Sequence, residues 1–154
     1  MENMDKCVQF SIFLVNKPGV LTQIFKELGK AKVNILNVAM MDTMEHGVLR
    51  LVASDHETAR PALKGLNIPV TETDVLSVTL GNHPGAAADL CDKLSAARIN
   101  IGYMYCSSGA RGGKTRVILK VPDINKAIGV LGGSRPQRRD MKVKLRRPAA
   151  TRKR

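Results

Sequence analysis

The tetrapeptide Asn-x-Pro-Gly occurs twice in this chain, as Asn16-Lys17-Pro18-Gly19 and as Asn82-His83-Pro84-Gly85, an interval of 66 residues (16 to 82). Each copy follows an apolar, β-prone run and precedes a run with helical spacing of apolar residues. A motif repeated in the same context indicates an internal duplication. The 154 residues therefore divide into two similar small units.

The similarity between the two halves extends beyond the motif. At the same interval, Val33-Asn34-Ile35 aligns with Ile99-Asn100-Ile101, Gly47 with Gly113 and Arg50 with Arg116. After a slip of two residues, Asp55 aligns with Asp123 and Leu63 with Leu131. Matches this regular support a duplication over most of the chain.

The hydrophobic periodicity predicts the order β-α-β-β-α-β in each half. In the first half we expect strands at 10–15, 34–40, 48–53 and 68–73, and helices from about 20 to a C-cap near Gly29 and over 56–64. In the second half we expect strands at 75–81, 99–107, 115–121 and 141–145, and helices at 85–97 and 123–131.

This order is that of the ferredoxin-like split βαβ unit. The sequence therefore predicts an α+β fold, with two such units packed together and antiparallel sheets that carry their helices on one face. Packing is expected because a unit of this size buries little apolar surface alone. We expect units at 1–73 and 74–145 and a disordered basic tail at 146–154.

Charge and composition narrow the class of protein. The formal net charge is +12, but residues 135–154 contain ten of the 25 Lys and Arg residues and one acid, so the basic character belongs to the tail. No apolar run approaches the ~18 residues of a membrane helix. The N-terminus also lacks a signal-peptide pattern, so we expect a cytoplasmic protein that does not enter a membrane. An odd number of cysteines, three, without a CxxC pair argues against a disulfide framework or a zinc site.

The repeated motif suits an α-amino acid. A helix N-terminus presents unpaired N–H groups and a partial positive charge, which favour a carboxylate. Gly19 and Gly85 allow close approach to the backbone, and the side chains of Asn16 and Asn82 both donate and accept hydrogen bonds. Asn34 and Asn100 open the next strands. We expect them beside the ends of the first strands, where they would supply a second polar contact.

These motifs resemble the ACT domain family of amino-acid-sensing modules, whose hallmark is (Asp/Asn)-x-Pro-Gly-x-(Leu/Ala) followed by Val-Asn-Ile. The resemblance covers residues 7 to about 131. It implies a stand-alone tandem ACT protein, without catalytic activity, cofactor or metal, whose effector lies between two ACT units. The ligand-binding residues that it implies are Asn16, Pro18, Gly19, Val20, Leu21, Asn34, Asn82, His83, Gly85, Ala86 and Asn100. The second copy departs from the hallmark, with Ala86-Ala87 in place of Val20-Leu21.

Two other signals are weaker. The segment from Ser108 to Thr115 is close to a phosphate-binding P-loop, but a strand-like run follows where a P-loop requires a helix. His46, His56 and His83 lack metal-binding spacing. We expect the first two to be solvated loop residues and His83 to lie beside the ligand. The sequence therefore predicts no catalytic residues and no metal ligands.

Three functions remain open. The favoured one is a regulatory module that binds a small amino acid and modulates a metabolic partner, as a homodimer or with a partner enzyme. In the second, a regulatory subunit or transcription-linked ACT protein acts mainly through protein contacts. In the third, the tail at 135–154 binds nucleic acid through phosphates. The third is not favoured, because the chain has five aromatic residues and no Trp with which to stack bases.

Overall fold

The structure is a computed structural model, and it describes residues 3–42, 46–110 and 113–133. The predicted strand at 141–145 and the predicted tail lie outside these residues. In chain order the elements are β1 (Met4–Val15), α1 (Val20–Lys30), β2 (Ile35–Asp42), β3 (His46–Ala53), α2 (His56–Lys64), β4 (Val70–Gly81), α3 (Ala86–Ala96), β5 (Tyr103–Ala110), β6 (Lys114–Lys120) and α4 (Ile124–Gly132). The predicted β-α-β-β-α-β order is therefore observed in the first half.

The six strands form one antiparallel sheet in the order β2-β3-β1-β4-β6-β5. This confirms the predicted α+β class with tandem ferredoxin-like units, and it adds that the two sheets are continuous. They join because β1 and β4 are each 12 residues long and pair with one another over most of their length. The predicted strands at 68–73 and 75–81 are thus parts of the single strand β4, and the predicted boundary between residues 73 and 74 falls inside it.

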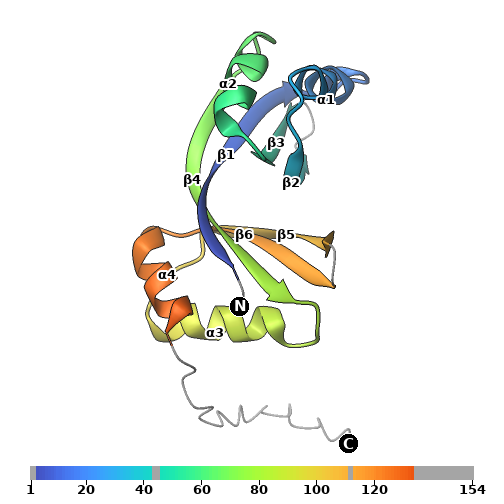
Figure 1. Cartoon of the computed structure of the whole chain (residues 1–154). Helices are drawn as coiled ribbons and strands as arrows, with labels where there is room; N and C mark the ends of the chain where they lie inside the picture. The colour runs from blue at the N-terminus through green and yellow to red at the C-terminus, as the bar shows by residue number, and fades with distance from the viewer. Residues whose placement is uncertain (1–2, 43–45, 111–112, 134–154) are drawn as a thin grey trace, which may run out of the picture.

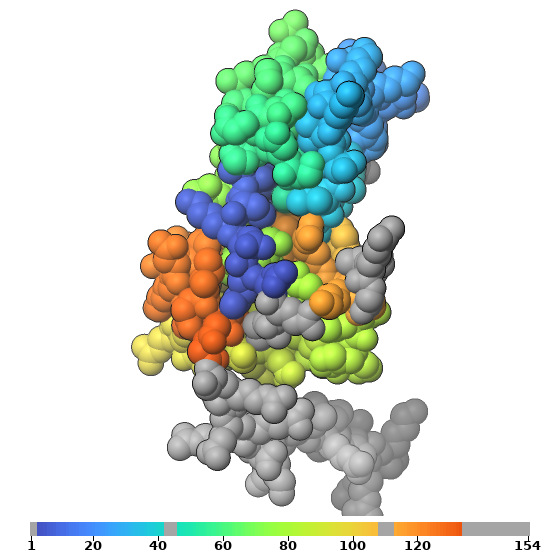
Figure 2. Space-filling view, viewed as in Figure 1, coloured from blue at the N-terminus to red at the C-terminus, as the bar shows by residue number. Residues whose placement is uncertain are grey.

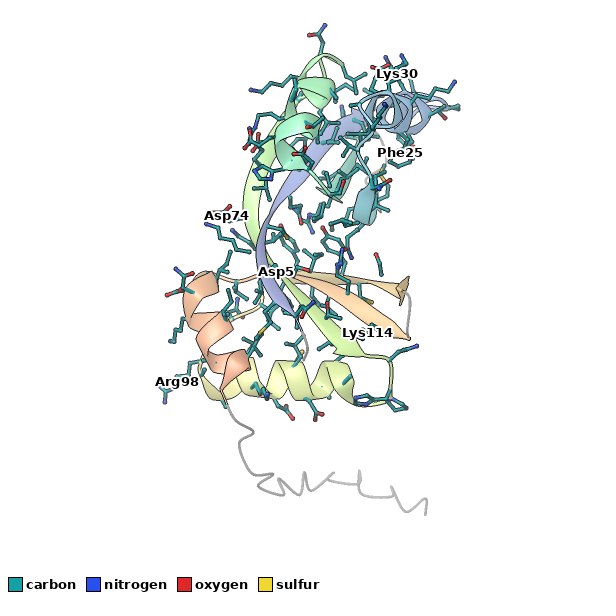
Figure 3. All side chains as sticks on the ribbon, in the orientation of Figure 1. Asp5, Phe25, Lys30, Asp74, Arg98 and Lys114 are labelled. Carbon is teal, nitrogen blue, oxygen red and sulfur yellow. The ribbon has the colours of Figure 1, made fainter. Side chains whose placement is uncertain are left out.

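The sheet has the symmetry of the sequence repeat. Val8 pairs with Asp74, which is also its counterpart at the 66-residue interval (8 to 74). A pseudo-two-fold axis therefore passes between these two residues, and Asp74 lies near the middle of the long strand pair (Figure 3). As a result, the start of β1 (Met4–Cys7) pairs with Val75–Val78. It serves as the fourth strand of the second half, as the start of β4 does in the first half.

Each half has its own core on the helical face of the sheet. In the first half, Phe10, Ile24 and Leu51 belong to one buried cluster, and in the second half Leu76, Leu90 and Leu119 belong to another. Figure 1 shows α1 and α2 on the outer side of the first half and α3 and α4 on the outer side of the second. Because the sheet bends along β1 and β4, its helix-free faces turn toward each other, and the halves pack together in Figure 2.

The helix termini follow local chemistry, with one correction. Asp55 accepts hydrogen bonds from the backbone N–H groups of Glu57 and Thr58 and begins α2, and Asp123 begins α4 in the same way. Gly29 is not the C-cap of α1. The helix continues to Lys30 and is capped by Ala31, because the chain reverses at Lys32, which has a left-handed φ of 57°.

The structure also tests the P-loop alternative. Residues from Lys114 to Lys120 form the strand β6, so no helix follows the glycine-rich segment and a P-loop is excluded there. Within the part of the chain that the structure describes, no helix is long and apolar enough to cross a membrane. No group of three or more His, Cys, Asp or Glu residues suited to a metal ion occurs among the same residues.

Candidate functional site

The two motif turns have nearly the same backbone. Gly19 has a φ of 91° and Gly85 a φ of 89°, in the left-handed region that favours glycine. The Lys17 N–H donates to the Val15 carbonyl at 2.9 Å, and the His83 N–H donates to the Gly81 carbonyl at 3.1 Å. The motif therefore specifies one turn shape twice, and the glycine is required by that shape.

Both turns leave the following helix open at its N-terminus. In the described residues no side chain caps α1 or α3, whereas aspartates cap α2 and α4. A Cβ built on Gly19 or Gly85 would meet nothing within 4 Å, so a ligand has room to approach. The Val20 and Ala86 N–H groups donate to the Lys17 and His83 carbonyls at 3.4 and 3.3 Å, and the other N–H groups of the first turn are thus available to an anion.

The predicted ligand residues lie at the surface, and they do not all come together. Asn16, Pro18, Gly19 and Asn34 are exposed, while Val20 and Leu21 are half-buried against the first core. In the second half, Asn82, His83, Gly85 and Asn100 are exposed and Ala86 is half-buried. Figure 1 shows the turn before α1 and the turn before α3 at opposite ends of the molecule.

Within one chain, Asn34 does not lie beside the end of β1, contrary to our expectation. The end of β1 pairs with the start of β3, with Val15 opposite His46. Asn34 instead lies at the end of β3, where its N–H donates to Ser54 Oγ at 3.1 Å and its carbonyl accepts from the Ser54 N–H at 2.8 Å. The reason is that in a βαβ unit the helix separates the end of the first strand from the start of the second. The 11 residues of α1 span about 16 Å, so Asn34 lies about that far from the motif turn.

The two motifs differ in ways that affect an anion. The first turn of α1 contains no acidic residue, whereas Asp89 lies in the first turn of α3. His83 packs beside Gly81, since a Cβ there would meet His83 Cδ2 at 3.1 Å. The Asn82 N–H also donates to the Gly113 carbonyl at 3.0 Å. The first helix start is therefore the more favourable one for a carboxylate.

Two open hollows on the surface contain few of the predicted residues. One of about 470 Å³ contains Asn100 and is otherwise lined by Cys91, Ser95, Arg98, Ile99 and Ile101. Arg98 projects away from the body of the molecule (Figure 3). Another of about 360 Å³ lies beside Lys6 and Asp74, which form an ion pair at 2.8 Å. Neither hollow includes a residue of the Asn-x-Pro-Gly turns.

The structure places a polar cluster between the two halves that the sequence did not predict. Gln9 Nε2 donates to Tyr103 Oη at 2.8 Å, and Tyr105 Oη donates to Gln9 Oε1 at 3.0 Å. Asn37 Nδ2 donates to Ser107 Oγ at 3.0 Å. Gln9 and Asn37 are amides within β-prone runs, and this is the sequence signal that could have indicated a buried polar contact.

Two ionisable groups, Tyr105 in this cluster and Cys7 near it, have shifted pKa values. Burial, with a contribution from the nearby Asp5 charge, raises the pKa of the Cys7 thiol to about 11. Burial likewise raises the pKa of the Tyr105 hydroxyl well above its ordinary value. Both groups therefore remain neutral at physiological pH, which suits a structural role between the halves better than a reactive one.

The comparison with protein families settles the identity of these repeats. A family model described as an ACT domain pair matches residues 5–133. The chain belongs to the ACT domain pair family. No curated protein sequence matches it.

Solved structures resemble this ACT pair over most of their length. Protein BT0572 from Bacteroides thetaiotaomicron is 34% identical, with a TM-score of 0.76, and the match covers 85% of this chain and 90% of that one. The ligand-free regulatory subunit of aspartate kinase from Thermus thermophilus is 12% identical, with a TM-score of 0.64 and coverage of 86% and 94%. The corresponding subunit from Thermus flavus is 15% identical, with a TM-score of 0.59 and coverage of 84% and 94%. The last two similarities concern the fold.

Proposed function

We propose that this ACT pair is a non-catalytic regulatory module that binds a small α-amino acid at its first motif and modulates a metabolic partner in the cytoplasm. The observation that carries the proposal is the open start of α1, where a left-handed Gly19 follows Asn16 and neither a cap nor an acidic residue is present. The fold shared with regulatory subunits of aspartate kinase supports the regulatory part of the proposal.

The ligand's parts match the groups around this turn. Its carboxylate would accept hydrogen bonds from the first-turn N–H groups of α1. Its ammonium would donate to the Asn16 side-chain oxygen, since that amide also accepts. Val20 and Leu21, both half-buried, would contact the ligand side chain. We expect weaker binding at the second motif, because Asp89 would repel the carboxylate.

We propose that a second copy of the chain completes the site. Asn34 lies at the wrong end of β2 to reach its own motif, but an antiparallel copy of β2 reverses that order. If two β2 strands pair around Val38, position 34 of the second copy lies opposite position 42 of the first, since both are four residues from 38. Position 42 pairs with Gly47, which pairs on its other side with Leu14 of β1, so position 42 lies at the end of the sheet from which the Asn16 turn leaves. The second copy's Asn34 then lies at the same end of the joined sheet as the first copy's turn, and the ligand would bridge the two.

The surface of the first half supports this dimer. β2 is an edge strand of the sheet, and its free N–H and C=O groups are a template for pairing. Of the nine exposed large apolar side chains in the described residues, eight lie in the first half: Phe13, Val15, Phe25, Ile35, Leu36, Val38, Met40 and Met41. Only Met104 lies in the second half. The exposed apolar surface is therefore concentrated in the first half, and five of these eight residues belong to the edge strand β2.

The amount of apolar surface at this edge is adequate for a dimer. Phe25 on α1 lies on the same side of the first half as β2 (Figure 3), and the six exposed side chains of α1 and β2 are 37–50% accessible. Each therefore presents about 80 Å², since a large apolar side chain exposes on the order of 200 Å². Two copies would bury about 1,000 Å² of side chain, the lower bound for a specific interface.

Isothermal titration with each of the twenty amino acids tests the proposed ligand. We expect one of them to bind, with affinity reduced about tenfold or more by Asn16→Ala, since a charged ligand loses a hydrogen bond. Asn82→Ala is the matched control and should change this affinity little. If no amino acid binds below about millimolar, or if Asn82→Ala removes the binding and Asn16→Ala does not, the proposed site is wrong.

A further inference from the structure

The edge strands β2 and β5 lie at opposite ends of the strand order, yet they contact each other across the helix-free face. We define the clasp as the residues that join the halves there: Gln9, Asn37, Tyr103, Tyr105 and Ser107. Arg50 of β3 also lies over the Tyr103 ring, 3.7 Å from its centroid. The contact between the halves combines the polar clasp with a small buried apolar cluster of Val52, Val75 and Ile118. Units of one chain commonly move relative to each other unless the interface between them is large and hydrophobic.

Asn37 is the member of the clasp that belongs to β2. Its side chain is 1% exposed, and Nδ2 donates to Ser107 Oγ at 3.0 Å and to the Arg116 carbonyl at 3.4 Å. Asn37 Oδ1 is buried without a hydrogen-bond partner in the described residues. A buried acceptor that lacks a donor is unfavourable, so the present arrangement of Asn37 is poised to change if β2 shifts.

β2 also provides a route from the candidate site to the clasp. The pairing of β2 with β3 shifts register between Ile35 and Asn37, so a bulge separates Asn34 from Asn37. Bulges bend a strand locally and redirect the side chains beside them. A ligand that pulls on Asn34 therefore acts on the segment that orients the Asn37 amide.

We propose that Asn37 is a coupling residue, which links effector binding at the Asn34 end of β2 to the contact between the two ACT halves. Binding shifts the bulge, the Asn37–Ser107 hydrogen bond breaks, and the second half moves relative to the first. This inference rests on the proposed function and specifies how occupancy of the site reaches the rest of the molecule.

The chain contains a native probe of this event. It has two tyrosines and no tryptophan, and both tyrosines, Tyr103 and Tyr105, belong to the clasp. We would titrate each of the twenty amino acids into the protein while recording tyrosine emission alongside calorimetry. The expected result is a saturable change in emission with the midpoint of the calorimetric binding curve.

Variants on either side of the hydrogen bond then test Asn37. Asn37→Ala should abolish most of the emission change and shift the amino-acid affinity by about fivefold or more, the usual range of coupling between sites. Ser107→Ala removes the same hydrogen bond from β5 and keeps the test valid if Asn37→Ala fails to fold. A purely structural Asn37 would lower the melting temperature and leave the emission change intact. Ser95→Ala, an exposed change on α3, is the control.

The outcomes separate the two proposals. If an amino acid binds and the emission does not change, or if Asn37→Ala preserves the change, the coupling is wrong and the ligand site stands. If no amino acid binds, the proposed function is wrong, and Ser54→Ala then tests the route by removing the side chain that holds the Asn34 backbone. In the wild-type protein, Ser54→Ala should alter tyrosine emission. In the Asn37→Ala variant, the same Ser54→Ala change should leave the emission unaltered. The absence of that difference would overturn the coupling.

Discussion

At the scale of single residues, the repeated turn depends on the absence of a side chain. Gly19 and Gly85 have left-handed φ values of 91° and 89°. Because they have no Cβ, they also leave the starts of α1 and α3 open. The sequence predicted that a helix begins at each of these glycines, and the structure confirms it, because a turn is a local property. It did not predict Asn34 correctly within one chain, since the place of a strand start depends on pairing with a distant strand.

Replacing Gly19 should therefore be costly even without a ligand. Gly19→Ala is expected to destabilise the protein by about 1–2 kcal/mol, because a Cβ disfavours a left-handed φ. Gly29→Ala, in the same helix and with nothing within 4 Å of its Cβ, should be neutral or stabilising by up to about 1 kcal/mol. Urea unfolding at one fixed protein concentration measures both, and equal effects of the two changes would contradict this account of the turn.

Cys7 gives a prediction that depends on pH. Its pKa is raised from 9.0 to about 11 in the folded protein, so the unfolded chain loses the thiol proton first. The stability contributed by neutral Cys7 is therefore fully present below pH 9 and is lost as the pH rises toward 11.

At pH 8 a thiol reagent should modify the exposed Cys106 much faster than Cys7.

Mass spectrometry after a short exposure to the reagent identifies which thiol has reacted. Cys7→Ala should leave the fast phase unchanged and should weaken the loss of stability between pH 9 and pH 11. Rapid modification of Cys7 in the folded protein would show that the thiol is not held between the halves as the structure indicates.

At the scale of elements, β2 is the strand on which the proposals depend. Its periodicity predicted a strand, and the observed β2 (Ile35–Asp42) lies close to the predicted 34–40. The sequence did not show that this strand is an edge or that Asn37 is buried against β5, because both facts follow from how the two halves close on each other. A repeat aligned with itself shows equivalence between halves and says little about contacts between them.

A charge on the β2 edge should prevent dimerisation. Val38→Lys places an ammonium at the centre of the proposed interface, where a buried charge without a partner is unfavourable, and charged edge residues block strand pairing. Met104→Lys makes the matched change at the repeat position in β5 (38 to 104) and should leave the dimer intact. Sedimentation velocity gives the oligomeric state. A dimer that survives Val38→Lys and dissociates with Met104→Lys would reverse the assignment of the interface.

At the scale of the whole molecule, the two ACT halves share their longest strands. Met4–Cys7 of β1 pairs with β4 in the second half, Met4 packs against the second core, and Lys6 forms an ion pair with Asp74. The sequence predicted two units but a first strand only at 10–15, whereas β1 begins at Met4. The shared segment contains the charged residues Asp5 and Lys6 and no apolar run, so the sequence did not show this sharing.

Because the two halves share β1, removing its first residues should affect the second half, which is distant in sequence. Deleting residues 1–6 should speed amide hydrogen exchange in the second half, at Leu76–Leu80, more than at Leu49–Leu51 in the first half. The physical reason is that β4 then loses its neighbour along the part that covers the second core. Asp5→Ala, which keeps the strand, is the control. Equal loss of protection in both halves would indicate that the first residues stabilise the protein only in a general way.

The central claim is that the effector site is formed by the motif turn of one copy and Asn34 of another, and subunit mixing tests it most directly. Asn16→Ala and Asn34→Ala dimers should each lose binding of the amino acid found by calorimetry. Mixing the two variants in equal amounts should restore about a quarter of the wild-type sites, because half of the dimers are mixed and each of these has one intact site. No recovery after demonstrated subunit exchange would contradict a shared site.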